Sequence, residues 1–565
     1  MLRKALAAAL GVLLAVPGIF LLSACSPSTD RGLQVSAGGS PGQGAVEESF
    51  RLDYVEKEPG RAGGTLRASI AADPLVLDNQ VTYTGQWFAR IVGDFLVYLD
   101  EDGRIGPYLA TSWEISPDGK LYTFHLRHDV TFSDGTKFDA EAVRANLARI
   151  KDPRTHGELS TALLDPYAEG RVIDEYTFQA RLREPFGGFL NVLASSYFCM
   201  LSPKAIRENP KGLVERPVAT GPFLVESYTR NQGIVFVRRP DYHWSPPRIG
   251  HSGPAYLDRI EVSFVPEALV RYTSLVAGQY DLTLSSPPQN APAIRADPSL
   301  VLKNFIMPGI PTRIPFFNTE KAPFDDVRVR KAFALAVDRE GVARIMGFGE
   351  FRLKTDFLFS NSRYYDPSFK DVLNYDPAAA NRLLDEAGWT GRDAEGYRTR
   401  NGRRLSAAVY LSQSSTALVA IQSDVKKIGF ELTIRQYPAT QLKALILNND
   451  YQATSGGLSY NGNTPDVLYI RYHSSQINTG RFIGQNDSRL SDPQLDDLLG
   501  RARASRDPAE LKRLYSKAQG RLVELVPAVP LYEAQLSAAY QSYVKGILFD
   551  TSNNNPFFTA AWLDR

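Results

Sequence analysis

Residues 454–463, TSGGLSYNGN, come within one residue of a catalytic motif. A serine nucleophile on a sharp strand-to-helix turn needs glycine two residues before it and two residues after it. Ser459 has Gly457 before it, but Asn461 stands where the second glycine would be. The pattern therefore favours a loop that lines a binding site, and a secreted hydrolase remains an alternative.

The remaining residue types that do chemistry are dispersed. The six histidines contain no His-Glu-x-x-His motif, and the two cysteines, Cys25 and Cys199, cannot form a zinc cluster. Gly347-Phe348-Gly349 lacks the third glycine and the lysine of a phosphate-binding loop. We expect no catalytic residue, no metal and no cofactor.

Charge and length exclude further classes. The chain has 64 basic and 62 acidic residues among 565, so it has no basic footprint for nucleic acid. A chain of this length exceeds one hydrophobic core, and two or more domains are expected. We expect a monomer without a nucleic-acid partner.

The N-terminus has the order of a secretory signal. Arg3 and Lys4 precede the apolar residues 5–22, and Leu22-Ser23-Ala24-Cys25 resembles a bacterial lipobox. This resemblance implies a signal peptide at residues 1–24 and a lipid on the Cys25 thiol. Residues 25–63 are rich in Gly, Ser, Pro and charges, which is typical of a flexible tether. The alternative is a single membrane-spanning helix at residues 5–22.

Strands and helices alternate along the body. The residues at 64–70 alternate as in a strand, and residues 113–126 predict a hairpin about Pro117-Asp118-Gly119. Asp139 can cap a helix. The other expected elements are helices at 325–346, 377–387, 417–428 and 507–527, and a strand at 430–437. The class is therefore α/β.

Several segments, in order, resemble the family 5 extracellular solute-binding proteins. The segment YLATSWEISPDGKLYTFHLRHDVTFSDGTKFDAEAV, at 108–143, is similar to the signature segment of that family. The segments ATGPFLVESY, RRPDYHW, FNTEKAPFDDVRVRKAFALAVDRE, YDPAAANRLLDEAGW and IQSDVKKIGFELTIRQY match further blocks, at 219–228, 238–244, 317–340, 375–389 and 421–437.

This resemblance implies a two-lobed periplasmic-binding-protein-like fold of type II with an extra third domain. Lobe I would comprise residues 64–100, 215–305 and 530–565. The extra domain would comprise 101–214 and lobe II 306–529. Hinge crossings near 308–311 and 527–530 would let the lobes close on a ligand.

The resemblance also implies a function. Members are substrate-binding receptors of ABC importers of the peptide and nickel type, which capture a peptide-like or other small polar solute between the lobes. The partners would be that solute, the permease and ATPase subunits, and the membrane through the lipid anchor, at an extracytoplasmic location. An extracytoplasmic chaperone or a solute sensor using the same cleft remains an alternative.

The ligand residues follow from the same resemblance. Peptide-binding members have an acidic residue where Tyr460 stands here, beside Asn461, and some have an arginine where Thr454 stands. Tyrosine cannot neutralise an ammonium group, so a free peptide N-terminus is disfavoured unless Asp466 supplies the charge. The other expected ligand residues are Asn79, Tyr83, Trp87 and Asn318. Arg471 could meet an anionic ligand, but its alternative is a surface arginine.

Overall fold

The computed structural model describes the chain from residue 59 onward with several gaps. The described ranges are 59–81, 88–99, 104–306, 312–360, 362–455, 466–479, 484–533, 535–549 and 556–565. The predicted signal peptide, the tether up to residue 58 and the elbow-like serine lie outside these ranges. The predicted lipidation and ligand residues that also lie outside them are Cys25, Tyr83, Trp87, Tyr460 and Asn461.

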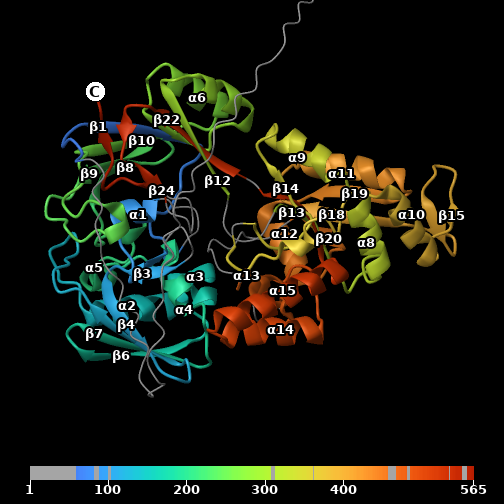
Figure 1. Ribbon diagram of the computed structural model, residues 1–565, viewed down its shortest axis with the longest axis horizontal. Coiled ribbons are helices and arrows are strands. Elements are labelled where there is room, and N and C mark those ends of the chain that lie inside the picture. The colour runs from blue at the N-terminus through green and yellow to red at the C-terminus, as the bar shows by residue number, and fades with distance from the viewer. Residues whose placement is uncertain are drawn as a thin grey trace, which may run out of the picture. The chain divides into compact units, whose positions relative to one another are not determined.

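A mixed seven-stranded sheet unites both ends of the described chain (Figure 1). The strand predicted at 64–70 is confirmed as β1, whose Leu66 and Ala68 side chains are fully buried. β1 runs parallel to β10 and β11, and the other pairs are antiparallel. In spatial order the strands are β12 (Leu300–Ile306), β22 (Gln535–Gln541), β11 (Leu282–Leu284), β1 (Thr65–Ile70), β10 (Arg259–Phe264), β9 (Gly233–Arg238) and β8 (Phe223–Thr229).

Short helices pack on this sheet. Leu275 and Ile294, from two different helices, share one buried cluster with Leu300 and Ala539 of the sheet. Burial of such apolar side chains contributes roughly 1.5–3 kcal/mol each. The helices are α1 (Ala89–Val92), α6 (Ala268–Val276) and α7 (Ala291–Ala296).

An antiparallel four-stranded sheet with its own helices forms a second part, called here the extra domain. The predicted hairpin is confirmed as β4 and β5, and the Asp139 side chain accepts a hydrogen bond from the amide of Ala142 at 2.8 Å, which caps α2. The strands are β4 (Ala110–Ile115), β5 (Leu121–Leu126), β7 (Thr177–Leu182) and β6 (Tyr167–Asp174), and the helices are α2 (Ala140–Lys151), α3 (Glu158–Leu163), α4 (Phe189–Leu193) and α5 (Pro203–Glu208).

A six-stranded sheet organises the third part. The strands, in spatial order, are β14 (Arg352–Leu353), β21 (Ala528–Glu533), β13 (Thr312–Phe317), β20 (Ala453–Thr454), β18 (Ser406–Leu411) and β19 (Glu431–Gln436). The helices are α8 (Val327–Ala336), α9 (Arg339–Gly347), α10 (Pro377–Glu386), α11 (Thr416–Lys427), α12 (Ala439–Leu447), α13 (Val467–Tyr472), α14 (Pro493–Ala504) and α15 (Pro508–Leu525). α14 and α15 lie side by side (Figure 1).

Small sheets complete the described strands. They pair β2 (Val97–Leu99) with β3 (Ile105–Pro107), β15 (Gly391–Arg392) with β16 (Arg398–Arg400) and β17 (Arg403–Arg404), β23 (Val544–Lys545) with β26 (Trp562–Leu563), and β24 (Leu548–Phe549) with β25 (Pro556–Phe557). No helix in the described ranges is both long and apolar enough to cross a bilayer.

The single helix predicted at 325–346 is wrong, because the chain forms two helices there. Val337 has an extended backbone and interrupts the helical path between α8 and α9. The Asp338 side chain then accepts a hydrogen bond from the amide of Gly341 at 3.0 Å and caps α9. Apolar spacing is continuous across the break, so the local cap decides the boundary.

The chain returns from the six-stranded to the seven-stranded sheet a few residues further along the sequence than the predicted hinge at 527–530. Both prolines of the predicted hinge at 527–530 stay with the six-stranded sheet, where Pro530 pairs with Arg313 beside a register shift. A proline lacks the N–H that a regular ladder needs, so it fits at such an irregular position. The chain instead passes to the seven-stranded sheet between Glu533 and Gln535. The residue bounds of the three domains stay a prediction.

Candidate ligand-binding site

Three parallel strands end at one edge of the six-stranded sheet. β18 is parallel to both β19 and β20, so Leu411, Gln436 and Thr454 mark the carboxyl ends of neighbouring strands. In open α/β sheets, ligands bind outside the carboxyl ends of the strands. The predicted ligand residue Thr454 therefore lies at the edge where a site is expected.

Thr454 is fully buried at this edge. Its Oγ1 donates to the carbonyl oxygen of Tyr410 at 3.0 Å, and the amide of Ser455 donates to the same oxygen at 3.1 Å. These bonds fix the end of β20 against β18. A threonine hydroxyl provides hydrogen bonding but no charge, so position 454 cannot neutralise an ionised group.

Aromatic side chains gather beside this edge. Tyr410, Tyr451 and Leu442 share a buried cluster, and the ring centroids of Tyr410 and Tyr437 lie 5.2 Å apart. The Tyr451 hydroxyl donates to the carbonyl oxygen of Asp487 at 2.7 Å. Aromatic walls with few polar groups are typical of small-molecule sites.

Asn318, another predicted ligand residue, is fully buried after β13. Its Nδ2 donates to Oδ1 of Asn449 at 2.7 Å and to the carbonyl oxygen of Tyr451 at 2.8 Å, and its Oδ1 accepts from the amide of Glu320 at 3.1 Å. Both amide hydrogens are thus engaged within the protein. The side chain fastens the end of β13 to the loop before β20, and its ligand role stays a prediction.

Asn79 lies in a different part, in the segment after β1. Its side chain is buried, and its Nδ2 donates to the carbonyl oxygen of Leu77 at 3.2 Å. Its Oδ1 has no hydrogen-bond partner among the residues that the structure describes. The neighbouring Asp78 is fully buried and forms an ion pair with Arg149 of α2. Asn79 thus follows a strand of the seven-stranded sheet, whereas Thr454 and Asn318 belong to the part built on the six-stranded sheet. Its Oδ1 can still accept a hydrogen bond.

Asp466, the alternative acid, directly precedes α13 and is buried. Its Oδ1 lies 3.4 Å from Nε of Arg503. Burial raises the pKa of Asp466, and the charge of Arg503 opposes that rise. The countercharge of this carboxylate is therefore an arginine of the protein.

Arg471 is buried, and its interpretation as an exposed surface arginine is wrong. Its side chain is 1% exposed, and its Nη1 lies 3.7 Å from Oδ2 of Asp487. The neighbours Val467, Ile470 and Tyr472 are buried too, so α13 is enclosed on more than one face. The apolar residues around Arg471 were the sequence signal for this burial.

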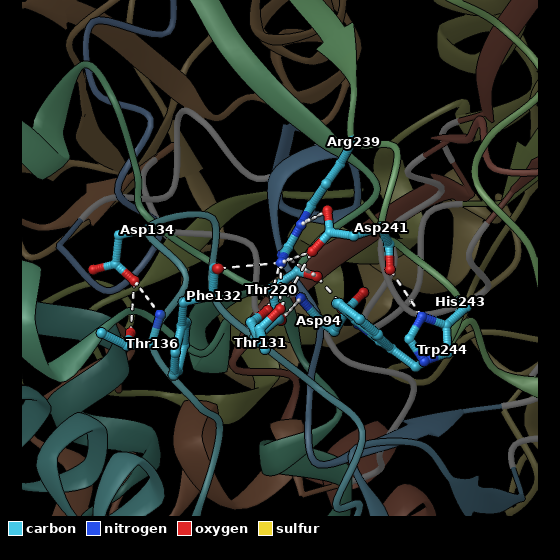
Figure 2. A network of polar contacts seen from close by, with 10 residues as sticks. All are labelled: Asp94, Thr131, Phe132, Asp134, Thr136, Thr220, Arg239, Asp241, His243 and Trp244. Atoms are coloured by element: carbon cyan, nitrogen blue, oxygen red, sulfur yellow. Dashed lines mark hydrogen bonds and ion pairs between the residues drawn. The ribbon is translucent and has the colours of Figure 1, made fainter.

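The buried guanidinium of Arg239 joins the extra domain to the part built on the seven-stranded sheet (Figure 2). It donates to the carbonyl oxygens of Thr131 at 2.8 Å and Phe132 at 3.1 Å, and it pairs with Asp241 at 2.8 Å. A longer bond of 3.4 Å reaches the carbonyl oxygen of Thr220. An arginine fork has five N–H donors in one plane, so a single residue holds several backbone carbonyls in place.

The carboxylate of Asp94 is a second buried centre of this network. The Tyr108 hydroxyl donates to it, as do the Tyr242 hydroxyl at 3.3 Å and Nε1 of Trp244 at 2.9 Å. Burial raises the pKa of Asp94, while the hydrogen bonds from Tyr108 and Trp244 oppose the rise. The network was not predicted from the sequence, in which its only signal is one acid inside the apolar run 91–99.

The sequence was compared with models of known protein families. The model of bacterial extracellular solute-binding proteins, family 5, matches residues 104–480, which is more than half of the chain. The chain belongs to this family. The predicted resemblance is thereby confirmed.

Individual relatives are similar to this solute-binding protein in sequence or structure over most of its length. The glutathione-binding protein GsiB of Escherichia coli is 28% identical over 455 residues, 79% of this chain and 84% of that one. The structure of DppA from Helicobacter pylori with the peptide STSA is 25% identical, has a TM-score of 0.73 and covers 89% of this chain and 99% of that one. The structure of AgaA with agropinic acid, from A. tumefaciens R10, is 26% identical, has a TM-score of 0.71 and covers 87% and 96%.

These comparisons confirm the fold class as an α/β, two-lobed type II periplasmic-binding-protein-like fold with an extra third domain. The solute-binding protein is an extracytoplasmic substrate-binding receptor of an ABC importer. Its family and fold are those of binding proteins. Among the residues that the structure describes, no three His, Cys, Asp or Glu side chains group as a metal site requires.

Proposed function

We propose that this receptor captures a small polar solute without a free peptide amino terminus, such as a blocked or modified peptide or an opine-like conjugate. The uncharged side chain at position 454 carries this proposal. The Thr454 hydroxyl is already bonded to Tyr410, and the acid at 466 is already opposed by Arg503. An ammonium group taken out of water needs a fixed countercharge, and neither position offers one.

The relatives support a small polar ligand of varied chemistry. GsiB is named for glutathione, AgaA was solved with agropinic acid, and DppA with a tetrapeptide. Such a range on one fold means that the loops around the site set the specificity. Tyr460, Asn461, Tyr83 and Trp87 are our proposed wall residues, together with Thr454, Asn318 and Asn79.

The proposed mechanism needs no covalent chemistry. The lobe built on the seven-stranded sheet and the lobe built on the six-stranded sheet close on the solute, and the closed form delivers it to the permease. Closure is a population shift that follows from contacts of the ligand with both lobes. An enzyme would need a positioned nucleophile or base, and the described residues of the edge offer hydrogen bonds and aromatic faces instead.

Thermal unfolding of the mature body without its lipidated cysteine (residues 26–565) tests the ligand class. We expect stabilisation by N-blocked peptides or sugar–amino acid conjugates and none by free di- or tripeptides. A ligand at one hundred times its Kd adds about 2.7 kcal/mol to the free energy of unfolding. The variant Tyr460→Asp, which restores the acid of peptide-binding relatives, is expected to gain a response to free peptides.

Stabilisation of the unaltered protein by free peptides would show that another residue holds the amino group, and the proposed ligand class would be wrong. The absence of stabilisation by every compound would favour the chaperone alternative instead.

We further propose that the receptor is held at the membrane by a lipid on Cys25, after removal of residues 1–24. The sequence order of charge, apolar run and lipobox supports this proposal.

In cell fractionation, Cys25→Ser is expected to move the protein from the membrane fraction to the soluble fraction. The variant lacks the thiol that carries the lipid, and multiple acyl chains are what anchors the protein stably. Cys199→Ser, which changes the other cysteine, is the matched control and should stay with the membrane. Retention of Cys25→Ser at the membrane would favour the spanning-helix alternative.

A further inference from the structure

The extra domain is fastened to the part built on the seven-stranded sheet by buried charged groups. Arg239 holds the carbonyl oxygens of Thr131 and Phe132, as Figure 2 shows, and Arg149 of α2 pairs with the fully buried Asp78. Both arginine side chains are at most 10% exposed, so water would replace their partners poorly if the two parts separated. These two parts are therefore expected to move as one body.

The same extra domain also touches the part built on the six-stranded sheet, at the end of α14 and the connector to α15. The amide of Gly187 donates to the carbonyl oxygen of Arg503 at 2.9 Å. Nη2 of Arg506 lies 3.4 Å from the carbonyl oxygens of Ser116 and Pro117. A Cβ atom on Gly187 would lie 2.4 Å from the carbonyl oxygen of Ser505, so only glycine permits this approach.

The Arg503 side chain lies at the seam between these two parts. It is 10% exposed, with Asp466 3.4 Å away on its own side and Oε1 of Glu184 3.9 Å away on the other. Its guanidinium also lies over one ring from each side, Tyr469 at 4.2 Å and Phe186 at 4.7 Å. Acid and aromatic partners of both parts thus face one cation.

We propose that Arg503 and Gly187 form a latch that stabilises the closed arrangement of the receptor independently of the ligand. Arg503 is a positioning residue, because it holds Asp466 at the start of α13, immediately after the predicted ligand loop. Opening the lobes would separate the Gly187 amide from its acceptor and expose the guanidinium. The latch rests on the lobe closure of the proposed function, but not on the identity of the solute.

Small-angle X-ray scattering of the ligand-free mature chain tests the latch. Arg503→Ala removes a charged, mostly buried contact, so the ratio of closed to open molecules is expected to fall about tenfold or more. Its radius of gyration should therefore rise above that of the unaltered protein. Arg503→Lys, which keeps the charge, should restore part of the compactness.

A second variant weakens the latch without changing the charge of Arg503. Gly187→Ala should also raise the radius of gyration, and the Gly187 amide should lose protection from hydrogen exchange. Gly500→Ala in α14 is the matched control, since a Cβ there meets nothing within 4 Å and should change neither quantity.

The latch would be overturned if folded Arg503→Ala and Gly187→Ala scatter as the unaltered protein does, or if the ligand-free unaltered protein is already open. Because no solute is added, a wrong ligand class leaves this result unaffected.

Discussion

Replacing Asp94 with alanine is expected to lower the free energy of unfolding by about 3–5 kcal/mol. The carboxylate is the shared acceptor of the Tyr108 hydroxyl, the Tyr242 hydroxyl and Nε1 of Trp244. All three side chains are buried, so water cannot replace the acceptor. Each buried donor left without a partner costs about 1–3 kcal/mol. Part of this loss is recovered, because the Tyr108 and Tyr242 hydroxyls, 3.3 Å apart, can bond to each other and Nε1 of Trp244 keeps the carbonyl oxygen of Thr220 at 3.1 Å.

Denaturant unfolding followed by tryptophan fluorescence measures this effect, since Trp244 lies in the network. Asp94→Asn should cost less than Asp94→Ala, because the amide keeps the shape and one acceptor oxygen. Asp371→Ala is the control, as that side chain is 67% exposed, and it should stay within about 0.5 kcal/mol. A loss below about 1 kcal/mol for Asp94→Ala would contradict the assigned role.

Replacing Lys354 with methionine is expected to cost a similar amount, about 3–5 kcal/mol near neutral pH. The Nζ atom lies 2.8 Å from Oδ1 of Asp356 and 3.8 Å from Oε1 of Glu533, and 3.7 Å from the centroid of the Tyr365 ring. Lys354 and both acids are buried. Methionine fills much of the volume but leaves two buried carboxylates without their cation.

The cost of Lys354→Met should depend on pH. Burial already raises the pKa of Asp356, and Lys354 is the charge that opposes this rise. Without Lys354 the folded-state pKa rises further above the unfolded value. Such a group stabilises the folded state at low pH, and that stabilisation is lost as the pH rises through the folded pKa. The loss should therefore be smaller at about pH 5 than at about pH 7.

Unfolding free energies of Lys354→Met and the unaltered protein, measured at both pH values, check whether the loss is smaller at the lower pH. Lys370→Met changes a lysine that is 64% exposed and is the control, with a small and nearly pH-independent effect. An equal loss for Lys354→Met at both pH values would mean that Asp356 does not gain a proton, and the charge account would be wrong.

Local signals predicted much of the fold. The hairpin of β4 and β5, the Asp139 cap and the ends of the helices predicted at 377–387 and 417–428 depend on neighbouring residues, which the sequence displays directly. The break between α8 and α9 was missed because the apolar spacing continues across it. The position of the second crossing was missed because prolines are read as chain breakers, whereas Pro530 fits an irregular point of a sheet.

The candidate site was less predictable, because its contacts join distant parts of the chain. Family resemblance indicated Thr454 and Asn318, but not that their side chains are bonded to Tyr410 and Asn449. Asp94 and Trp244 stand 150 residues apart and meet only after folding. Arg503 is an ordinary basic residue in the sequence, and its two acidic neighbours come from separate parts.

The strand order of the seven-stranded sheet sets a sequence of events during export. Every strand of the six-stranded sheet lies between residues 312 and 533, so that sheet can be complete while the chain is still emerging. β22, by contrast, begins at Gln535 and pairs with both β11 and β12. Until it arrives, both partners expose edges that invite wrong pairing. The lobe that contains the first strand is therefore the last to mature, and a chain stopped before residue 535 would present unpaired sheet edges to its neighbours in the extracytoplasmic space.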